Sequence, residues 1–154
     1  MTVPCNTSDL ARPDSKTIQS LFNAIPEHYD FLNSFLSLGL EHYWRARLVS
    51  YLDDHKAILD LGAGTGKSLA GFLKAHAFRL AVGSDFSEKM LQKANERLSG
   101  SATLIACDFH ELPFSSGSFD LVTGSFMLRS VQDMTRFLSE VKRVLAPKGR
   151  VLFL

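Results

Sequence analysis

The chain has 154 residues, a formal net charge of +1 and 45% apolar residues. This length allows one domain with a core of its own, and the balanced charge gives no electrostatic sign of nucleic-acid binding. No uninterrupted apolar run approaches the ~18 residues that a membrane-spanning helix needs.

Cysteine usage and the N-terminal composition indicate where the protein resides. The two cysteines, Cys5 and Cys107, lie far apart and form no metal-ligand pattern, and the first residues lack the basic start and apolar stretch of a secretory signal. We therefore expect reduced thiols, no metal site and a cytoplasmic location.

The N-terminal third of the chain has a helical pattern. Residues 1–14 are expected to form a loose N-terminus. Within residues 15–54, apolar side chains from Ile18 to Ile25 recur at the spacing of one helix face. Gly39 divides the aromatic-rich stretch that follows into two helices.

From residue 55 the pattern becomes an alternation of strand and helix. The expected strands are Ala57–Leu61, Leu80–Ser84, Thr103–Ala106, Leu121–Gly124 and Val151–Leu154. The expected helices are Lys67–His76, Ser87–Leu98 and Asp133–Leu145, with Pro147 ending the last one and a turn over residues 146–150. This alternation indicates an α/β fold, with a parallel sheet and helices on both faces.

The turn after the first expected strand is dense in glycine. A phosphate loop would need glycine at Leu61, and a dinucleotide fingerprint would need glycine at Lys67. The actual glycines, Gly62, Gly64 and Gly66, are closer together and let main chain approach a ligand. This spacing suits a ligand whose amino-acid end sits against the turn, although tight helix packing could also require it.

Acidic residues follow the second and third expected strands. Asp85 can accept hydrogen bonds from both hydroxyls of a ribose, and Asp108 can meet the amino edge of an adenine whose ring lies against Phe109. Two simpler interpretations remain open, in which Asp85 only favours a helix N-terminus and Asp108 is only a turn residue.

In this chain order the residues resemble the class I S-adenosylmethionine-dependent methyltransferases, whose first motif is similar to "LDLGAGTG". The stretch "FNAIPEHYDFLNSFLSLGLEHYW" is similar to the N-terminal signature of the ubiquinone/menaquinone-biosynthesis C-methyltransferase family. Its matching residues are Tyr29, Asp30, Asn33, Ser37 and Trp44. "LPFSSGSFDLVTGSFMLRSVQDM" and "RVLAPKGRVLFL" resemble two later family stretches, so the likeness covers about residues 18–154.

The resemblance implies a Rossmann-like core over residues 55–154, preceded by a helical substrate lid over residues 15–54. It implies S-adenosyl-L-methionine as cofactor and a prenylated benzoquinol or demethylmenaquinol as methyl acceptor. Arg129 is the candidate for stabilising the quinol oxyanion, and Tyr29 and Asp30 are candidates for orienting the ring. The expected cofactor-binding residues are Asp60, Gly62, Ala63, Gly64, Thr65, Gly66, Asp85, Phe86, Asp108, Phe109 and Ser125.

The chain departs from the family pattern at several points. It has Glu41 where the family usually has His, Ser130 where it has Asn, and Lys148 where it has Gly. The family's sheet has strand order 3-2-1-4-5-7-6, whereas this sequence stops within the fifth strand. Either the chain is a fragment, or a homo-oligomer or a partner strand covers that edge.

The prenylated acceptor implies contact with the inner face of a membrane without spanning it. Two other functions stay open at this point. The chain could methylate a different small molecule, or it could be a truncated, non-catalytic subunit or assembly element.

Overall fold

The computed structural model describes residues 40–52 and 54–154. Its helices are α3 (Leu40–Val49), α4 (Lys67–Ala75), α5 (Glu88–Leu98) and α6 (Met134–Val144), with a short 3-10 helix, η1, at Leu128–Ser130. Its strands are β1 (Ala57–Leu61), β2 (Leu80–Asp85), β3 (Thr103–Ala106), β4 (Phe119–Gly124) and β5 (Leu145–Phe153). Most of the predicted lid, residues 15–39, lies outside the described residues.

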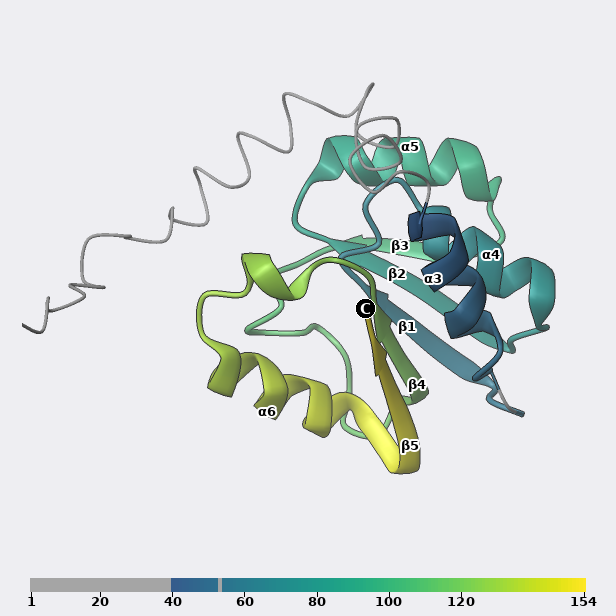
Figure 1. The fold of residues 1–154 in the computed structure, drawn as a ribbon. Helices are drawn as coiled ribbons and strands as arrows, with labels where there is room; N and C mark the ends of the chain where they lie inside the picture. The colour runs from purple at the N-terminus through teal and green to yellow at the C-terminus, as the bar shows by residue number, and fades with distance from the viewer. Residues whose placement is uncertain (1–39, 53) are drawn as a thin grey trace, which may run out of the picture.

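The strands form one five-stranded sheet in the order β3-β2-β1-β4-β5, and every neighbouring pair is parallel (Figure 1). β1 is central, and all five of its residues are buried. A strand buried on both faces is rich in apolar residues, and "AILDL" is apolar at every position except Asp60. The predicted α/β fold with a parallel sheet is confirmed.

Helices cover both faces of the sheet, as predicted. Because side chains alternate along a strand, Ile58 and Leu59 of β1 belong to different cores. Ile58 lies in a core shared with residues of α3, α4 and α5. Leu59 lies in a second core, which α6 closes from the other face with Phe137, Val141 and Val144 (Figure 1).

Side-chain caps fix where the helices after β2 and η1 begin. The Ser87 hydroxyl accepts from the Met90 backbone N–H at the start of α5, at 3.4 Å. Asp133 caps α6 by accepting from the Arg136 N–H at 2.9 Å. Serine and aspartate are preferred at this position because their oxygens satisfy otherwise unpaired N–H groups of the first turn.

The prediction of a turn over residues 146–150 is wrong, because β5 begins at Leu145 and runs through this stretch. The pairing of β4 with β5 is irregular, with a register shift between Phe119 and Leu121 of β4. Lys148 has a φ of 66° inside the strand. An irregularity of this kind lets a strand accommodate residues such as Pro and Gly, which otherwise indicate a turn.

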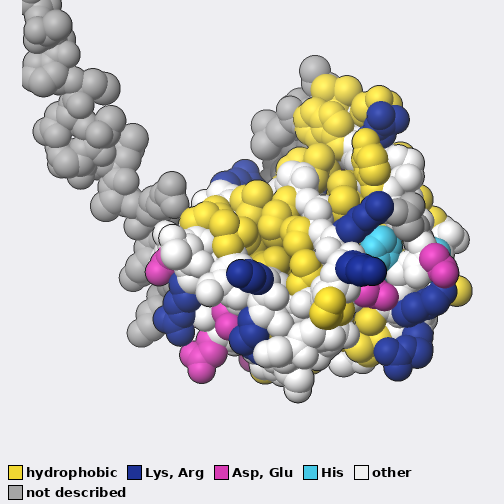
Figure 2. Space-filling view, turned by 90° about the horizontal axis from the view of Figure 1, so that it is seen from below, with side chains coloured by type: hydrophobic (Ala, Val, Ile, Leu, Met, Phe, Trp, Pro, Cys, Tyr) yellow, Lys and Arg dark blue, Asp and Glu magenta, His cyan; other side chains and the backbone are white. Residues whose placement is uncertain are grey.

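β5 lies at one edge of the described sheet. Large apolar side chains are exposed close by, with Met134 at 38% and Leu138 at 48% on α6, and Val151 at 38% on β5. Figure 2 shows the molecule from below the view of Figure 1, and hydrophobic side chains gather over part of the surface seen there. Among the described residues, no helix combines the length and apolar character that crossing a bilayer requires.

Phe137 provides a test of the core under α6. It has 0% exposure and packs against the ring of Phe153, at a ring-centroid distance of 5.7 Å. Phe137→Ala should lower the free energy of unfolding by about 3–5 kcal/mol, because the cavity it leaves cannot collapse fully. The neighbouring Leu138→Ala should cost less than about 1 kcal/mol in the same urea titration. Equal losses would contradict this assignment of the core face.

Candidate cofactor site

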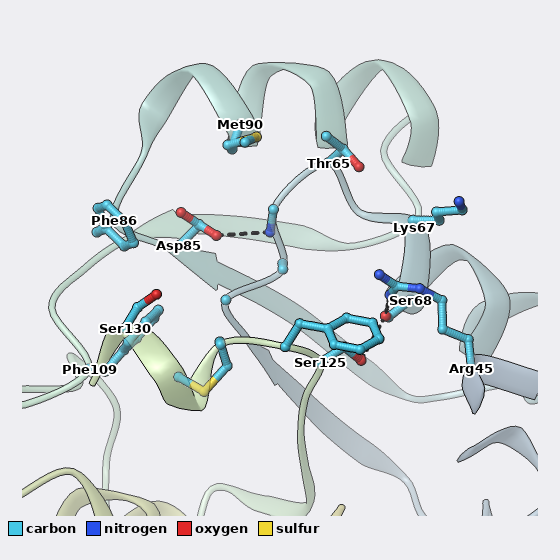
Figure 3. A pocket seen from close by; sticks show the side chains of 15 residues that line it. Arg45, Thr65, Lys67, Ser68, Asp85, Phe86, Met90, Phe109, Ser125 and Ser130 are labelled. Carbon is cyan, nitrogen blue, oxygen red and sulfur yellow. Dashed lines mark hydrogen bonds between the residues drawn. The ribbon is translucent and has the colours of Figure 1, made fainter. Parts of the chain in front are cut away.

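A cleft opens at the carboxyl ends of the central strands, beside the point where the strand order reverses between β1 and β4 (Figure 3). Open parallel sheets bind ligands at this position. The cleft is lined by Arg45, Gly62, Ala63, Gly64, Thr65, Lys67, Ser68, Asp85, Phe86, Met90, Phe109, Ser125, Phe126, Met127 and Ser130. Eight of the expected cofactor-binding residues are among them, whereas Asp60, Gly66 and Asp108 are not.

The three glycines of the turn all have left-handed backbone, with φ of 63° at Gly62, 55° at Gly64 and 75° at Gly66. A Cβ at Gly62 would lie 2.6 Å from the Met127 Cβ, and one at Gly66 would lie 3.1 Å from the Ala94 Cβ. A Cβ at Gly64 would meet nothing nearer than 3.9 Å. Packing against Met127 excludes a side chain at Gly62, and Ala94 leaves little room for one at Gly66, whereas a side chain at Gly64 would meet no close neighbour.

Asp85 ends β2 with its carboxylate fixed against the turn. Its Oδ2 accepts from the Gly64 N–H at 2.9 Å (Figure 3). Its Oδ1 accepts from the Ser87 N–H at 2.9 Å. Burial raises the pKa of Asp85, and the hydrogen bonds from Ser87 and Gly64 partly offset this. A carboxylate oxygen has more than one lone pair, so the Asp85 carboxylate can also accept hydrogen bonds from two adjacent hydroxyls of a ligand.

An apolar compartment adjoins Asp85. The rings of Phe86 and Phe109 meet edge to face, with centroids 6.3 Å apart and planes at 81°. Met90, which is 1% exposed, completes this part of the lining. A flat heteroaromatic ring fits such surroundings, because two aromatic side chains and a polarisable thioether can contact it.

Asp108 has an exposed side chain that is bonded outside the cleft. Its Oδ1 accepts from the His110 backbone N–H at 2.8 Å and pairs with the His110 Nδ1 at 2.7 Å. Partial burial would raise the pKa of Asp108, but the hydrogen bonds from His110 outweigh it and the pKa is lowered. The Nε2 of His110 accepts from the Asp133 N–H at 3.2 Å, so this loop is tied to the start of α6.

The remaining predicted site residues lie in different places. Ser125 lines the cleft beside Ser68. Arg129 lies in η1 with an exposed side chain and does not line the cleft, although the adjacent Ser130 does. Tyr29 and Asp30 lie outside the described residues. Within residues 40–52 and 54–154, no three His, Cys, Asp or Glu side chains are grouped to hold a metal ion.

Sequence reasoning missed the polar residues at the far end of the cleft. Arg45 of α3 and Lys67 and Ser68 of α4 line it there, and Glu41 of α3 is bonded to both cations. One signal was available, since Arg45 directly follows Trp44, the last residue of the N-terminal signature. The sequence did not show that α3 packs against α4, and this packing brings these side chains together.

Comparison with known proteins shows the family to which the chain belongs. The model of the ubiE/COQ5 methyltransferase family matches residues 10–154. The chain belongs to this family. It is 41% identical over 145 residues to the demethylmenaquinone methyltransferase of Thermobifida fusca, covering 90% of this chain and 61% of that protein. It is 36% identical over 140 residues to the ubiquinone/menaquinone biosynthesis C-methyltransferase UbiE of Desulfotalea psychrophila, covering 89% and 57%.

Solved structures agree on the fold of this member of the ubiE/COQ5 family. Phosphoethanolamine N-methyltransferase 1 of Haemonchus contortus, solved with phosphoethanolamine and S-adenosylhomocysteine, superposes with a TM-score of 0.70 at 24% identity. The match covers 91% of this chain and 33% of that one. The chain thus has the Rossmann-like fold of class I methyltransferases, and it spans about three fifths of the length of the curated relatives it matches.

Asp60, one of the expected cofactor residues, lies beneath the turn with 1% exposure and accepts from the Thr123 hydroxyl at 2.7 Å. Burial raises its pKa from 3.8 to about 6, although the Thr123 hydrogen bond opposes this. The folded protein therefore holds this proton more tightly than the unfolded chain does. As pH rises from about 4 to about 6, the free energy of unfolding falls, and the loss persists above that range.

Asp60→Asn should remove this dependence while keeping an acceptor for Thr123. Relative to the variant, the wild type should lose roughly 2 kcal/mol of unfolding free energy between pH 4 and pH 7, taking about 1.4 kcal/mol per pK unit. Urea titrations at several pH values measure the difference. Parallel curves for the two proteins would show that Asp60 is ionised at its ordinary pKa.

Proposed function

We propose that the chain is the cofactor-binding part of an S-adenosyl-L-methionine-dependent C-methyltransferase of quinone biosynthesis, acting on a prenylated benzoquinol or demethylmenaquinol. The observation that carries the proposal is the Asp85 carboxylate, which is fixed by its hydrogen bond from Gly64 and lines a cleft that also contains an aromatic compartment. Family membership and the names of the relatives support the reaction and the acceptor.

The cleft residues fit the parts of this cofactor in sequence. Asp85 would accept the two ribose hydroxyls, and Phe86 and Phe109 would enclose the adenine. Gly64 leaves space for the chain that leads from the ribose, and Ser125 lies further along the same cleft. The cofactor supplies a methyl group that is already activated on a sulfonium.

The protein then has to align the acceptor carbon with the methyl group at about 3 Å and exclude water, which can account for much of the rate gain. A quinol carbon becomes nucleophilic when a ring hydroxyl loses its proton, so a cation near that oxygen favours the reaction. We assign this role to Arg129, whose chain neighbour Ser130 lines the cleft, with Tyr29 and Asp30 orienting the ring.

The family departures bear unequally on this function. Glu41 is 1% exposed and does not line the cleft, so the change from His does not place a new group against the acceptor. Ser130 does line the cleft, and a serine there leaves more space than the family's asparagine. We further propose that the acceptor's tail brings the protein into peripheral contact with a membrane and that a second copy or a partner strand covers β5.

Asp85→Ala tests cofactor binding. Loss of the carboxylate removes the ribose acceptors, so the dissociation constant for S-adenosylhomocysteine should rise at least about tenfold by isothermal titration calorimetry. Glu96→Ala removes an exposed carboxylate from α5 and should leave this constant unchanged. Unchanged affinity in Asp85→Ala would place the ribose elsewhere.

Arg129→Ala tests the oxyanion role. Methyl transfer to a demethylmenaquinol should slow by about tenfold or more, because one charge-stabilising donor is lost. Affinity for S-adenosylhomocysteine should stay within about twofold, because Arg129 does not line the cleft. Arg136→Ala, an exposed arginine of α6, is the matched control. Normal turnover of Arg129→Ala would remove Arg129 from the mechanism.

A further inference from the structure

The ionisable side chains that line the cleft are divided between its two ends. Asp85 lies at one end beside the aromatic compartment, and Arg45 and Lys67 lie at the other, as Figure 3 shows. Among the described residues, no carboxylate lines the cleft at the end of these two cations. A ligand that bridges the cleft would therefore meet hydrogen-bond acceptors at one end and positive charge at the other.

Glu41 holds the two cations from behind. Its carboxylate is 2% exposed, and it accepts from the Arg45 Nε at 3.2 Å and from the Lys67 Nζ at 2.5 Å. A buried carboxylate of this kind is tolerated because both of its oxygens have cationic donors. Since the two partners come from α3 and α4, Glu41 fixes both long side chains at the rim of the cleft.

The Arg45 guanidinium is further restrained on two sides. Its Nη1 donates to the Ser68 hydroxyl, and Ser68 in turn donates to the Ser125 hydroxyl at 2.9 Å (Figure 3). It also lies over the Phe126 ring, with the Cζ 5.3 Å from the ring centroid. An arginine held in this way has lost most of its rotamer freedom before any ligand arrives, which favours recognition of a planar anion.

We propose that Arg45, assisted by Lys67 and the Ser68–Ser125 pair, forms a subsite for the α-carboxylate at the amino-acid end of the ligand, and that Glu41 is the residue that positions it. The identity of the ligand rests on the proposed function. A fork of guanidinium N–H groups matches the two oxygens of a carboxylate, and hydrogen bonds to charged partners are stronger than neutral ones. The nucleoside end is bound independently, by Asp85 and the aromatic compartment.

Two ligands separate these ends of the cleft. S-adenosylhomocysteine carries the carboxylate, whereas its decarboxylated analogue, 5′-(3-aminopropylthio)-5′-deoxyadenosine, keeps the nucleoside, the thioether and the amine. The wild type should bind S-adenosylhomocysteine at least about tenfold more tightly than the analogue by calorimetry. Arg45→Gln should raise the dissociation constant of S-adenosylhomocysteine by about tenfold or more and change that of the analogue by no more than about twofold. The preference for the ligand with the carboxylate then disappears.

The controls use the same helix and the same charge. Arg47→Gln removes an exposed arginine of α3 that stacks on Tyr51, and it should retain full discrimination. Arg45→Lys keeps the positive charge but lacks the paired N–H groups of a guanidinium, so it should retain part of the discrimination between the two ligands. Asp85→Ala should raise the dissociation constants of both ligands by the same factor, because both contain the ribose.

The outcomes distinguish this inference from the function on which it rests. If the wild type binds both ligands equally, or if Arg45→Gln weakens both to the same extent, Arg45 does not read the carboxylate, although the nucleoside site stands. If the wild type binds neither ligand, the proposed function fails and this subsite fails with it. If Arg45→Gln does not fold, the wild-type comparison can still overturn the proposal, because equal binding of the two ligands would exclude a carboxylate subsite.

Discussion

The hydrogen bond from the Gly64 N–H to the Asp85 carboxylate is the contact on which the cleft depends. It joins the turn after β1 to the end of β2, and the Ala63 N–H reinforces it by donating to the Ser84 carbonyl at 2.9 Å. The parallel register, which pairs Leu61 with Ser84, brings these groups next to one another. Asp85, which lies 21 positions after Gly64 in the chain, is thereby fixed beside the turn.

The turn keeps its shape because elements beyond β1 pack against it. Met127, from the loop after β4, fills the space beside Gly62, and Ala94 of α5 fills the space beside Gly66. Arg97 of α5 donates to both the carbonyl and the hydroxyl of Thr65, at 2.7 Å each. These contacts on either side of Gly64 stabilise the left-handed backbone of the turn. A binding site formed in this way is already in place before a ligand arrives.

Much of this arrangement could be predicted from the sequence, because it follows from local patterns and from parallel topology. β1 is recognisable as a buried apolar run, and parallel strands bring the residues at their carboxyl ends to one edge. Asp85, Phe109 and Ser125 all follow or end strands, so their positions in the chain suffice to place them near the glycines. The irregular start of β5 could not be expected, since proline and glycine indicate a turn in most contexts.

Pairings between long side chains of different elements were beyond sequence reasoning. Asp108 follows a strand as expected, yet His110, two residues later, supplies both of its donors and keeps it exposed. The contact between Glu41 and Lys67 spans 26 residues and depends on how α3 packs on α4. Neither pattern nor spacing encodes a packing angle, so such pairs are found only in the folded chain.

The substitution of Glu41 for the family's usual histidine has a structural consequence that extends to the cleft. A neutral imidazole has one acceptor nitrogen, so it cannot accept from both Arg45 and Lys67, whereas a carboxylate can. Conversely, a carboxylate with 2% exposure would be costly without two cationic partners. Glu41, Arg45 and Lys67 therefore form a mutually dependent set, and its two cations line the end of the cleft that faces α3.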